Sequence, residues 1–114
     1  MAFLKQRRSK EGAFRAKVRE DLKAFKKQWG IFYEPIQQRS IKGSADYHLC
    51  VCGTFVALEL KRDAIEEPFP IQRLKLNDVI NAGGIGIVAY PANWQDVLIR
   101  LEQMCIQDRG KNVV

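Results

Sequence analysis

The sequence predicts a single α/β domain with the element order α-β-β-β-α-β-α, in which helices flank a mixed central sheet. Three observations lead to this prediction. Apolar residues recur at helical spacing near the start of the chain, alternate around a two-residue turn in its middle, and form a β-branched run after a second helical stretch. A chain of 114 residues has room for one hydrophobic core, so residues 1–114 are treated as one domain.

The first helix is predicted over residues 9–28. Ser9 can cap its N-terminus. Four apolar residues at helical spacing form its inward stripe: Phe14, Val18, Leu22 and Phe25. Trp29-Gly30 ends the helix, residues 31–35 form a short extended segment, and residues 37–43 form a polar, basic loop.

A β-hairpin is predicted over residues 45–61. Cys52-Gly53 is its two-residue turn, so Val51 pairs with Thr54. The same register places Asp46 directly across from Glu59, with Lys61 two residues further along the same face. Two carboxylates this close repel each other unless a positive charge lies between them, and a hard divalent cation with oxygen ligands can supply that charge.

A loop and a second helix follow the hairpin. Residues 63–70 form a loop with two prolines and three acidic residues, and Pro70 begins the helix. The apolar residues expected to face inward are Leu74, Leu76, Val79 and Ile80. Gly83-Gly84 ends this helix.

The last part of the chain predicts a buried strand and a third helix. The β-branched run from Ile85 to Tyr90 is the strand, and a right-handed crossover is expected to make it parallel to the hairpin strand beside it. The helix is predicted from Trp94 to Cys105, and the chain from Gln107 is expected to be frayed. Its inward residues are expected to be Val97, Leu98, Leu101 and Cys105.

Basic residues concentrate at the start of the chain. Residues 1–27 carry ten Lys or Arg against three Asp or Glu, whereas the rest of the chain carries nine against ten. A basic segment of this kind is typical of a protein that binds nucleic acid. The alternative is a solvated basic helix without a partner.

The composition argues against membrane and secreted classes. No apolar run approaches the ~20 residues that span a bilayer. The first five residues lead into basic residues without the apolar core of a secretory signal. The odd number of cysteines, three, predicts reduced thiols. We therefore expect a cytoplasmic protein with no membrane partner.

Two spaced motifs resemble a known nuclease family. Gly43-Ser-Ala-Asp46, followed after twelve residues by Glu59-Leu-Lys61, resembles the PD-(D/E)XK motif, with Ala45 where many members have proline. The segments 58–62, 68–72 and 82–84, followed by a hydrophobic strand, resemble the VRR-NUC and Holliday-junction-resolvase-like branch, which has small phage-encoded members of this length. The resemblance covers about residues 9–103.

This resemblance implies a single restriction-endonuclease-like domain and a Mg²⁺-dependent endodeoxyribonuclease, with Mn²⁺ as a substitute. Such an enzyme hydrolyses phosphodiester bonds, here with selectivity for branched or junction DNA, in a bacterium or a phage-infected host cell. The small size of the chain is also consistent with a homodimer. Two alternatives stay open: a non-catalytic nucleic-acid-binding module on the same fold, and a nicking nuclease with sequence preference.

The resemblance also implies roles for individual residues. Asp46 and Glu59 would be metal ligands, Lys61 would contact the attacking water or the scissile phosphate, and Gln72 would support the site. Glu11, on the inward stripe of the first helix, would be a third acidic ligand, with Glu20 as its rival. Basic residues expected to contact DNA are Arg7, Arg8, Lys10, Arg15, Arg39, Lys42, Arg62 and Lys75.

Two other patterns are assigned structural meanings. His48, Cys50 and Cys52 alternate along one strand face, but structural zinc sites use Cys-x₂₋₄-Cys spacing across a knuckle, so no zinc is predicted. The glycine-rich segment 82–86 follows a helix and precedes a strand. A phosphate-binding loop needs the opposite order, so this segment is interpreted as a helix stop.

Overall fold

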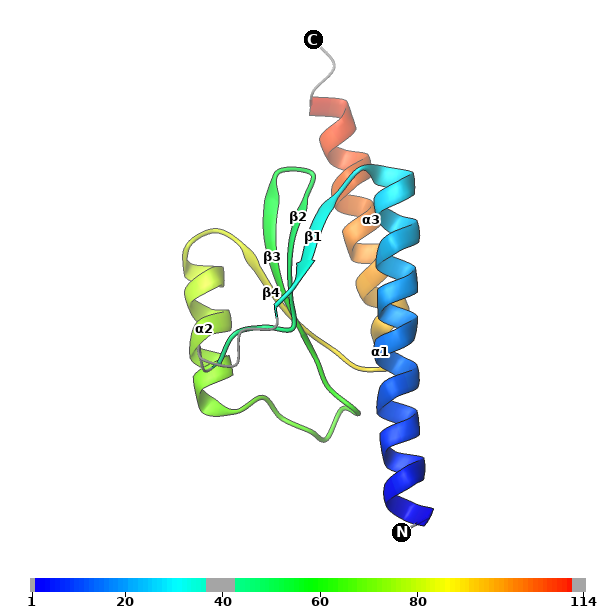
Figure 1. Ribbon diagram of the computed structural model, residues 1–114. Coiled ribbons are helices and arrows are strands. Elements are labelled where there is room, and N and C mark those ends of the chain that lie inside the picture. The colour runs from blue at the N-terminus through cyan, green and yellow to red at the C-terminus, as the bar shows by residue number, and fades with distance from the viewer. Residues whose placement is uncertain (1, 37–42, 112–114) are drawn as a thin grey trace.

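The computed structural model describes residues 2–36 and 43–111, with side chains described for residues 12–36 and 43–107. Over these residues the chain forms three helices and one four-stranded mixed sheet (Figure 1). In chain order the elements are α1 (Ala2–Trp29), β1 (Phe32–Pro35), β2 (Tyr47–Val51), β3 (Thr54–Leu60), α2 (Pro70–Asn81), β4 (Ile85–Ala89) and α3 (Trp94–Lys111). The predicted α/β class and element order are confirmed.

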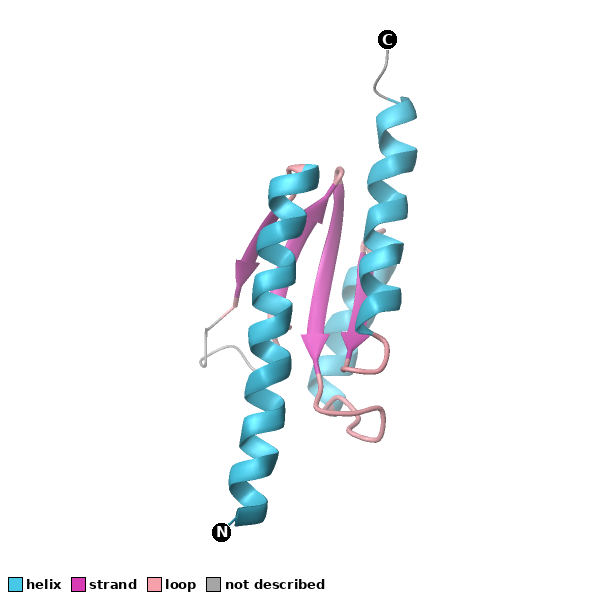
Figure 2. Cartoon of the chain, turned by 90° about the vertical axis from the view of Figure 1, so that its right-hand side faces the viewer, coloured by secondary structure: helices cyan, strands magenta, loops and turns pink. Residues whose placement is uncertain are grey.

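The strands lie across the sheet in the order β1-β2-β3-β4. The first two pairings, β1 with β2 and β2 with β3, are antiparallel, and β3 pairs with β4 in parallel as predicted. α1 and α3 cover one face of the sheet and α2 lies on the other (Figures 1 and 2). Residues that alternate along β2 and β3 therefore face either the α1–α3 layer or the α2 layer.

The hairpin register is the predicted one, with Val51 opposite Thr54. The turn residues Cys52 and Gly53 have φ angles of 50° and 85°. Positive φ at both central residues is the type I′ turn, whose twist matches the twist of the two strands that it joins. The turn therefore fixes which residues of β3 lie opposite those of β2.

Strand pairing ends one residue short of Asp46. The last pair of β2 with β3 is Tyr47 with Leu58, so Asp46 precedes β2, and Glu59, which pairs with Val88 of β4, has no partner in β2. The backbone N–H of Leu60 donates instead to Asp46 Oδ2 at 2.8 Å. The prediction that Asp46 lies directly across from Glu59 in the hairpin is therefore wrong. The pairing of the two strands stops before Asp46 because the short Asp46 side chain accepts the hydrogen bond from the Leu60 backbone.

The main core lies between the sheet and the pair α1 and α3. All four residues of the predicted α1 stripe are buried: Phe14, Val18, Leu22 and Phe25. Trp94, the first residue of α3, is 1% exposed, and its ring meets Phe14 edge-on with centroids 6.2 Å apart. The Trp94 Nε1–H donates to Asp21 Oδ2 at 2.8 Å, so one side chain joins α3 to α1 through apolar and polar contacts.

Both long helices extend past their predicted ends. α1 begins at Ala2, so Ser9 lies inside the helix and is not its cap. The residues before Ser9 include neither Gly nor Pro and are mostly good helix formers, so nothing stops the helix there. α3 runs to Lys111, so the predicted fraying from Gln107 is wrong over residues 107–111.

α2 buries less apolar surface than the sequence predicts. Leu76 is 8% exposed and Val79 is half-buried, but Leu74 and Ile80 are 60% and 51% exposed. The predicted inward positions of Leu74 and Ile80 are therefore wrong. α2 meets the sheet along a narrow stripe that packs on small residues such as Ala57, and a helix can bury only one such stripe.

The N-terminal half of α1 projects past the sheet. In both views it runs beyond the sheet at the end where β3 leads into the loop 61–69 (Figures 1 and 2). This half contains much of the basic character of the chain. Among the helices in the described part of the chain, none combines the length and the apolar character needed to cross a membrane.

Candidate active site

Asp46 lies where the chain enters β2 and is held by two donors. Arg15 of α1 places Nη1 3.2 Å from Asp46 Oδ1, and the backbone N–H of Leu60 donates to Oδ2. The Asp46 side chain keeps 25% of its surface exposed. These contacts orient the carboxylate between α1 and the end of β3 while leaving it accessible to solvent.

Gly43 fixes the approach of the chain to Asp46. Its φ is +84°, and a Cβ placed there would lie 2.8 Å from the backbone oxygen of Ile71 in α2. A side chain would be strained by this φ and would also clash with the helix backbone. Glycine therefore lets the segment before Asp46 pass close to the first turn of α2.

Glu59 is the most deeply buried acid of the site, with 4% of its surface exposed. Its Oε1 accepts a hydrogen bond from Gln72 Nε2 at 3.3 Å and lies 3.8 Å from Lys61 Nζ. Its Oε2 is buried and has no hydrogen-bond donor among the described residues. An unsatisfied buried carboxylate oxygen is costly, so it indicates a missing proton or cation.

Burial raises the pKa of Glu59 from 4.5 to about 8. This value of about 8 already includes two smaller causes that raise the pKa, the negative charge of Asp46 and a hydrogen bond between the two carboxyl groups, which forms only when one of them is protonated. The positive charges of Lys61 and Arg15 act in the opposite direction but do not compensate. In the metal-free protein the pair therefore keeps a proton near neutral pH.

Lys61 extends directly beyond β3 and is 7% exposed. Its Nζ donates to Gln72 Oε1 at 3.1 Å and lies 3.9 Å from Glu66 Oε1 in the following loop. The ammonium group also lies 5.4 Å from the centroid of the Phe69 ring. These contacts hold a buried cation beside Glu59 in one place.

Gln72 links the site to the start of α2. Its Oε1 accepts from the backbone N–H of Phe69 at 2.9 Å as well as from Lys61, while its Nε2 donates to Glu59. The side chain thus satisfies a donor at the N-terminus of the helix, which Pro70 starts. The amide is oriented by the helix end and in turn orients Glu59 and Lys61.

The structure brings together four of the residues predicted for the site: Asp46, Glu59, Lys61 and Gln72. Other predicted residues lie outside what it describes: Arg39 and Lys42 in the segment 37–42, and the side chains of Arg7, Arg8, Lys10 and Glu11. Glu20, the rival of Glu11, is exposed. Arg62 pairs with the acids of its own loop, at 3.4 Å from Asp63 Oδ2 and 3.6 Å from Glu66 Oε2.

Three contacts of the site were not predicted from the sequence. Arg15, predicted to contact DNA, reaches Asp46, and both Glu66 and Phe69 approach the Lys61 ammonium group. Arg15 and Asp46 are 31 residues apart, and no local pattern links them. For Glu66 and Phe69 the only sequence signal is their position in the short loop between Lys61 and Gln72.

The donor set fits a small, hard divalent cation. Asp46 is partly exposed, and Glu59 Oε2 is a buried acceptor without a donor among the described residues. Mg²⁺ is commonly bound by one or two protein carboxylates and keeps several waters, so two carboxylates suffice. Within residues 12–36 and 43–107, no group of three or more His, Cys, Asp or Glu side chains is placed to hold a metal.

No family model matches the chain, and no match is found among curated proteins or solved structures.

Proposed function

We propose that this chain is a Mg²⁺-dependent endodeoxyribonuclease of the PD-(D/E)XK type, with Asp46, Glu59 and Lys61 at the centre of its site. The observation that carries the proposal is the pair of neighbouring carboxylates, in which Glu59 Oε2 has no donor among the described residues and Lys61 Nζ lies 3.8 Å from Oε1. Such an arrangement is unfavourable for the folded protein alone. A retained proton relieves it in the metal-free protein, and a cation that joins the two acids would take the place of that proton.

Asp46 and Glu59 would hold the cation. When bound, Mg²⁺ or Mn²⁺ lowers the pKa of a bound water and acts as a Lewis acid on a phosphate oxygen. The residues supply orientation: Leu60 N–H and Arg15 hold Asp46 on one side, and Gln72 holds Glu59 on the other. Fixed ligands avoid reorganisation during the reaction.

Lys61 would act on the phosphate or on the attacking water. Its Nζ is fixed by Gln72 and lies beside Glu59, so it can donate to an oxygen that gains negative charge. Because the side chain is 7% exposed, this donor acts in surroundings that contain little water. Removal of one such donor typically lowers kcat by about 10²–10³-fold.

The projecting half of α1 supports DNA as the substrate. It extends past the sheet at the end where Lys61 follows β3 (Figure 2). Arg7, Arg8 and Lys10 belong to this half, and basic residues along a helix can follow a phosphate backbone. Glu20 is exposed and lies outside this half of α1, whereas Glu11 belongs to it and stays the candidate for a third acidic residue.

One observation favours a non-catalytic nucleic-acid-binding module as the second candidate. Each oxygen of Asp46 already accepts a hydrogen bond, one from Arg15 and one from Leu60. An aspartate held in this way can serve as a structural link between α1 and β3. Each carboxylate oxygen has a second lone pair, so metal binding stays compatible with these contacts.

Cleavage assays separate the two candidates. Supercoiled plasmid and a set of synthetic linear, nicked and branched DNA substrates are incubated with Mg²⁺ or Mn²⁺. The nuclease proposal predicts cleavage by the wild-type chain and its loss in Asp46→Ala and Glu59→Gln. Asp96→Ala, at an exposed acid in the first turn of α3, is the matched control and should cleave normally.

Salt-dependent DNA binding without cleavage in either metal would favour the binding module. Cleavage that persists undiminished in both Asp46→Ala and Glu59→Gln would overturn the assignment of the site.

A further inference from the structure

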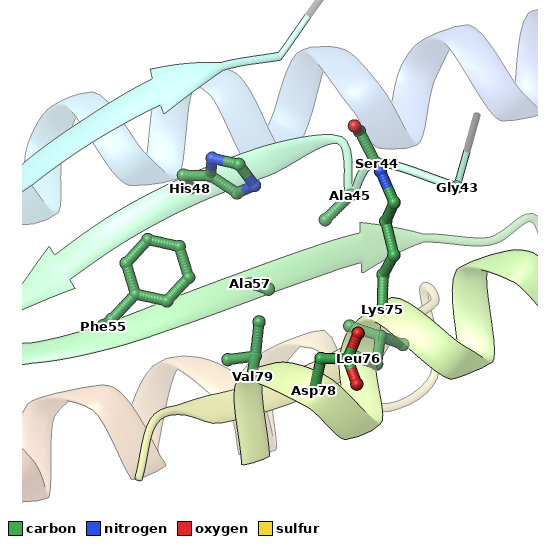
Figure 3. Close-up of a pocket in the computed structure, with 10 residues that line it drawn as sticks. All are labelled: Gly43, Ser44, Ala45, His48, Phe55, Ala57, Lys75, Leu76, Asp78 and Val79. Carbon is green, nitrogen blue, oxygen red and sulfur yellow. The ribbon is translucent and has the colours of Figure 1, made fainter. Parts of the chain in front are cut away.

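A cavity of about 310 Å³ lies between α2 and the face of β2 and β3 that is turned away from α1 and α3 (Figure 3). Its size is at the lower end of small-molecule pockets, which measure about 300–1,000 Å³. The described residues that line it are Gly43, Ser44, Ala45, His48, Phe55, Ala57, Lys75, Leu76, Asp78 and Val79. The proposed nuclease chemistry makes no use of this cavity.

The cavity has an aromatic end and a cationic end. His48 and Phe55 lie together at one end, with ring centroids 5.2 Å apart, and Phe55 is 44% exposed. At the other end the Lys75 side chain extends from α2 toward Ser44 (Figure 3). Small side chains such as Ala57 leave the space between the two ends open. A ligand that consists of a flat ring and an attached anion would match these two ends, because the ring can stack on the aromatic side chains and the anion can approach Lys75.

The cavity adjoins the carboxylate site along three elements. His48 is two residues after Asp46, and Ala57 is two residues before Glu59 on the same strand face. Two residues of a strand span about 6.6–6.8 Å, so neighbouring parts of one DNA strand can reach the carboxylates and the cavity together. On α2, Lys75 is three residues after Gln72 and thus on a neighbouring position of one helix face.

We propose that this cavity receives one unpaired base of the DNA strand, next to the phosphodiester bond that meets Asp46 and Glu59. The base would stack against the aromatic end, and Lys75 would contact the adjoining phosphate. Asp78, which also lines the cavity, can accept a hydrogen bond from an amino or ring N–H group of the base. The inference rests on the proposed function for its location beside a scissile bond.

This assignment narrows the substrate to DNA with unpaired nucleotides. A stacked and paired base is not available to a cavity of this size, whereas a flap, a loop or a single strand offers its bases directly. Duplex DNA would still bind through the basic α1, but without the contribution of the cavity.

Binding measured in EDTA tests the cavity without any need for cleavage. The probes are two fluorescently labelled strands of about 12 nucleotides, one of deoxyadenosine and one of abasic sugar phosphate, which have the same charge. Fluorescence anisotropy gives the affinity of each strand. Phe55→Ala removes the exposed ring of the aromatic end and leaves His48. Phe32→Ala, at an aromatic residue of the same sheet face that is 54% exposed and does not line the cavity, is its matched control.

The wild-type chain is expected to prefer the strand with bases by about 5- to 150-fold, which corresponds to stacking of about 1–3 kcal/mol. Phe55→Ala should lower this preference several-fold, and Phe32→Ala should keep it. Lys75→Gln should weaken binding of both strands and lower the salt dependence by about one phosphate contact. Arg73→Gln, at an exposed cation of the same helix that does not line the cavity, should keep that salt dependence.

Equal affinity of the wild-type chain for the two strands would overturn the proposal, and so would equal losses in Phe55→Ala and Phe32→Ala. Competition by free deoxyadenosine monophosphate at the concentrations of the strand would also overturn it, because the ligand would then be a free nucleotide. A base preference that depends on Phe55 in a chain that never cleaves DNA supports the cavity and rejects the nuclease. Cleavage without a base preference rejects the cavity and supports the nuclease.

Discussion

Replacing Glu59 with Gln should remove a pH dependence from the stability of the metal-free protein. Burial and the neighbouring Asp46 raise the pKa of Glu59 from 4.5 to about 8. Below pH 4.5 the group is protonated in both the folded and the unfolded chain. Between 4.5 and about 8 the folded chain keeps its proton while the unfolded chain has lost it, so the free energy of unfolding falls as the pH rises. Above about 8 the loss is complete.

The folded and unfolded chains differ by at most one bound proton in this pH range, and this difference sets the size of the effect. The free energy of unfolding should fall by at most about 1.4 kcal/mol per pH unit, and by a few kcal/mol in all. Two other groups have shifted pKa values, but they titrate outside this pH range. The pKa of Tyr47 is raised above 10.0 by burial, and hydrogen bonds from the backbone N–H groups of Glu66 and Ile65 lower the pKa of Asp63 below 3.8.

Urea unfolding in EDTA, followed by tryptophan fluorescence at several pH values between 4.5 and about 8, measures the effect. Glu59→Gln should show a flatter profile than the wild-type chain and should be the more stable of the two at the upper end. Glu34→Gln, at an exposed acid of β1, is the control for loss of one carboxylate and should keep the wild-type slope. Parallel profiles for the wild-type chain and Glu59→Gln would mean that the folded chain does not hold a proton on Glu59 in this pH range.

Three further substitutions test how the site and its frame are held. Gln72→Leu removes the acceptor of the Lys61 ammonium group, and single-turnover cleavage should slow by about 10- to 150-fold while the fold persists, as expected for a hydrogen bond of about 1.5–3 kcal/mol to a charged group. Trp94→Phe loses the hydrogen bond to Asp21 and some buried volume, so the urea midpoint should fall with a cost of about 1–3 kcal/mol; an unchanged midpoint would contradict the anchoring role. Gly43→Ala forces a Cβ to 2.8 Å from the α2 backbone at a φ of +84°, which should cost more than about 1 kcal/mol in urea unfolding and also reduce cleavage, whereas a neutral outcome would mean that this close approach is not needed.

The hairpin could be predicted because its determinants are local. Cys52-Gly53 sets the turn, and the turn sets the register of β2 and β3, so the sequence alone is enough to bring Asp46 close to Glu59. The stripe of α1 and the start of α2 at Pro70 follow from equally local patterns. The start of α1 could not be predicted from Ser9. A serine marks the N-terminus of a helix only where the residues before it are not themselves helical.

The details of the site depend on contacts between distant segments. The pairing of Arg15 with Asp46 and the burial of Glu59 arise only when α1 and α2 pack on the sheet. The exposure of Leu74 on α2 has a similar origin, because the sheet beneath offers a narrow stripe of small residues. Apolar spacing gives the candidate faces of a helix, but the surface opposite decides which of them is buried.

In the proposed nuclease, a divalent cation joins Asp46 and Glu59 in the working site. The most direct measurement is anomalous X-ray diffraction from crystals of the protein grown or soaked with Mn²⁺. We expect an anomalous peak in contact with the Asp46 carboxylate and with Glu59 Oε2, the oxygen that has no donor among the described residues, and no peak there in Glu59→Gln. Wild-type crystals that bind Mn²⁺ elsewhere and leave these two carboxylates without a peak would contradict it.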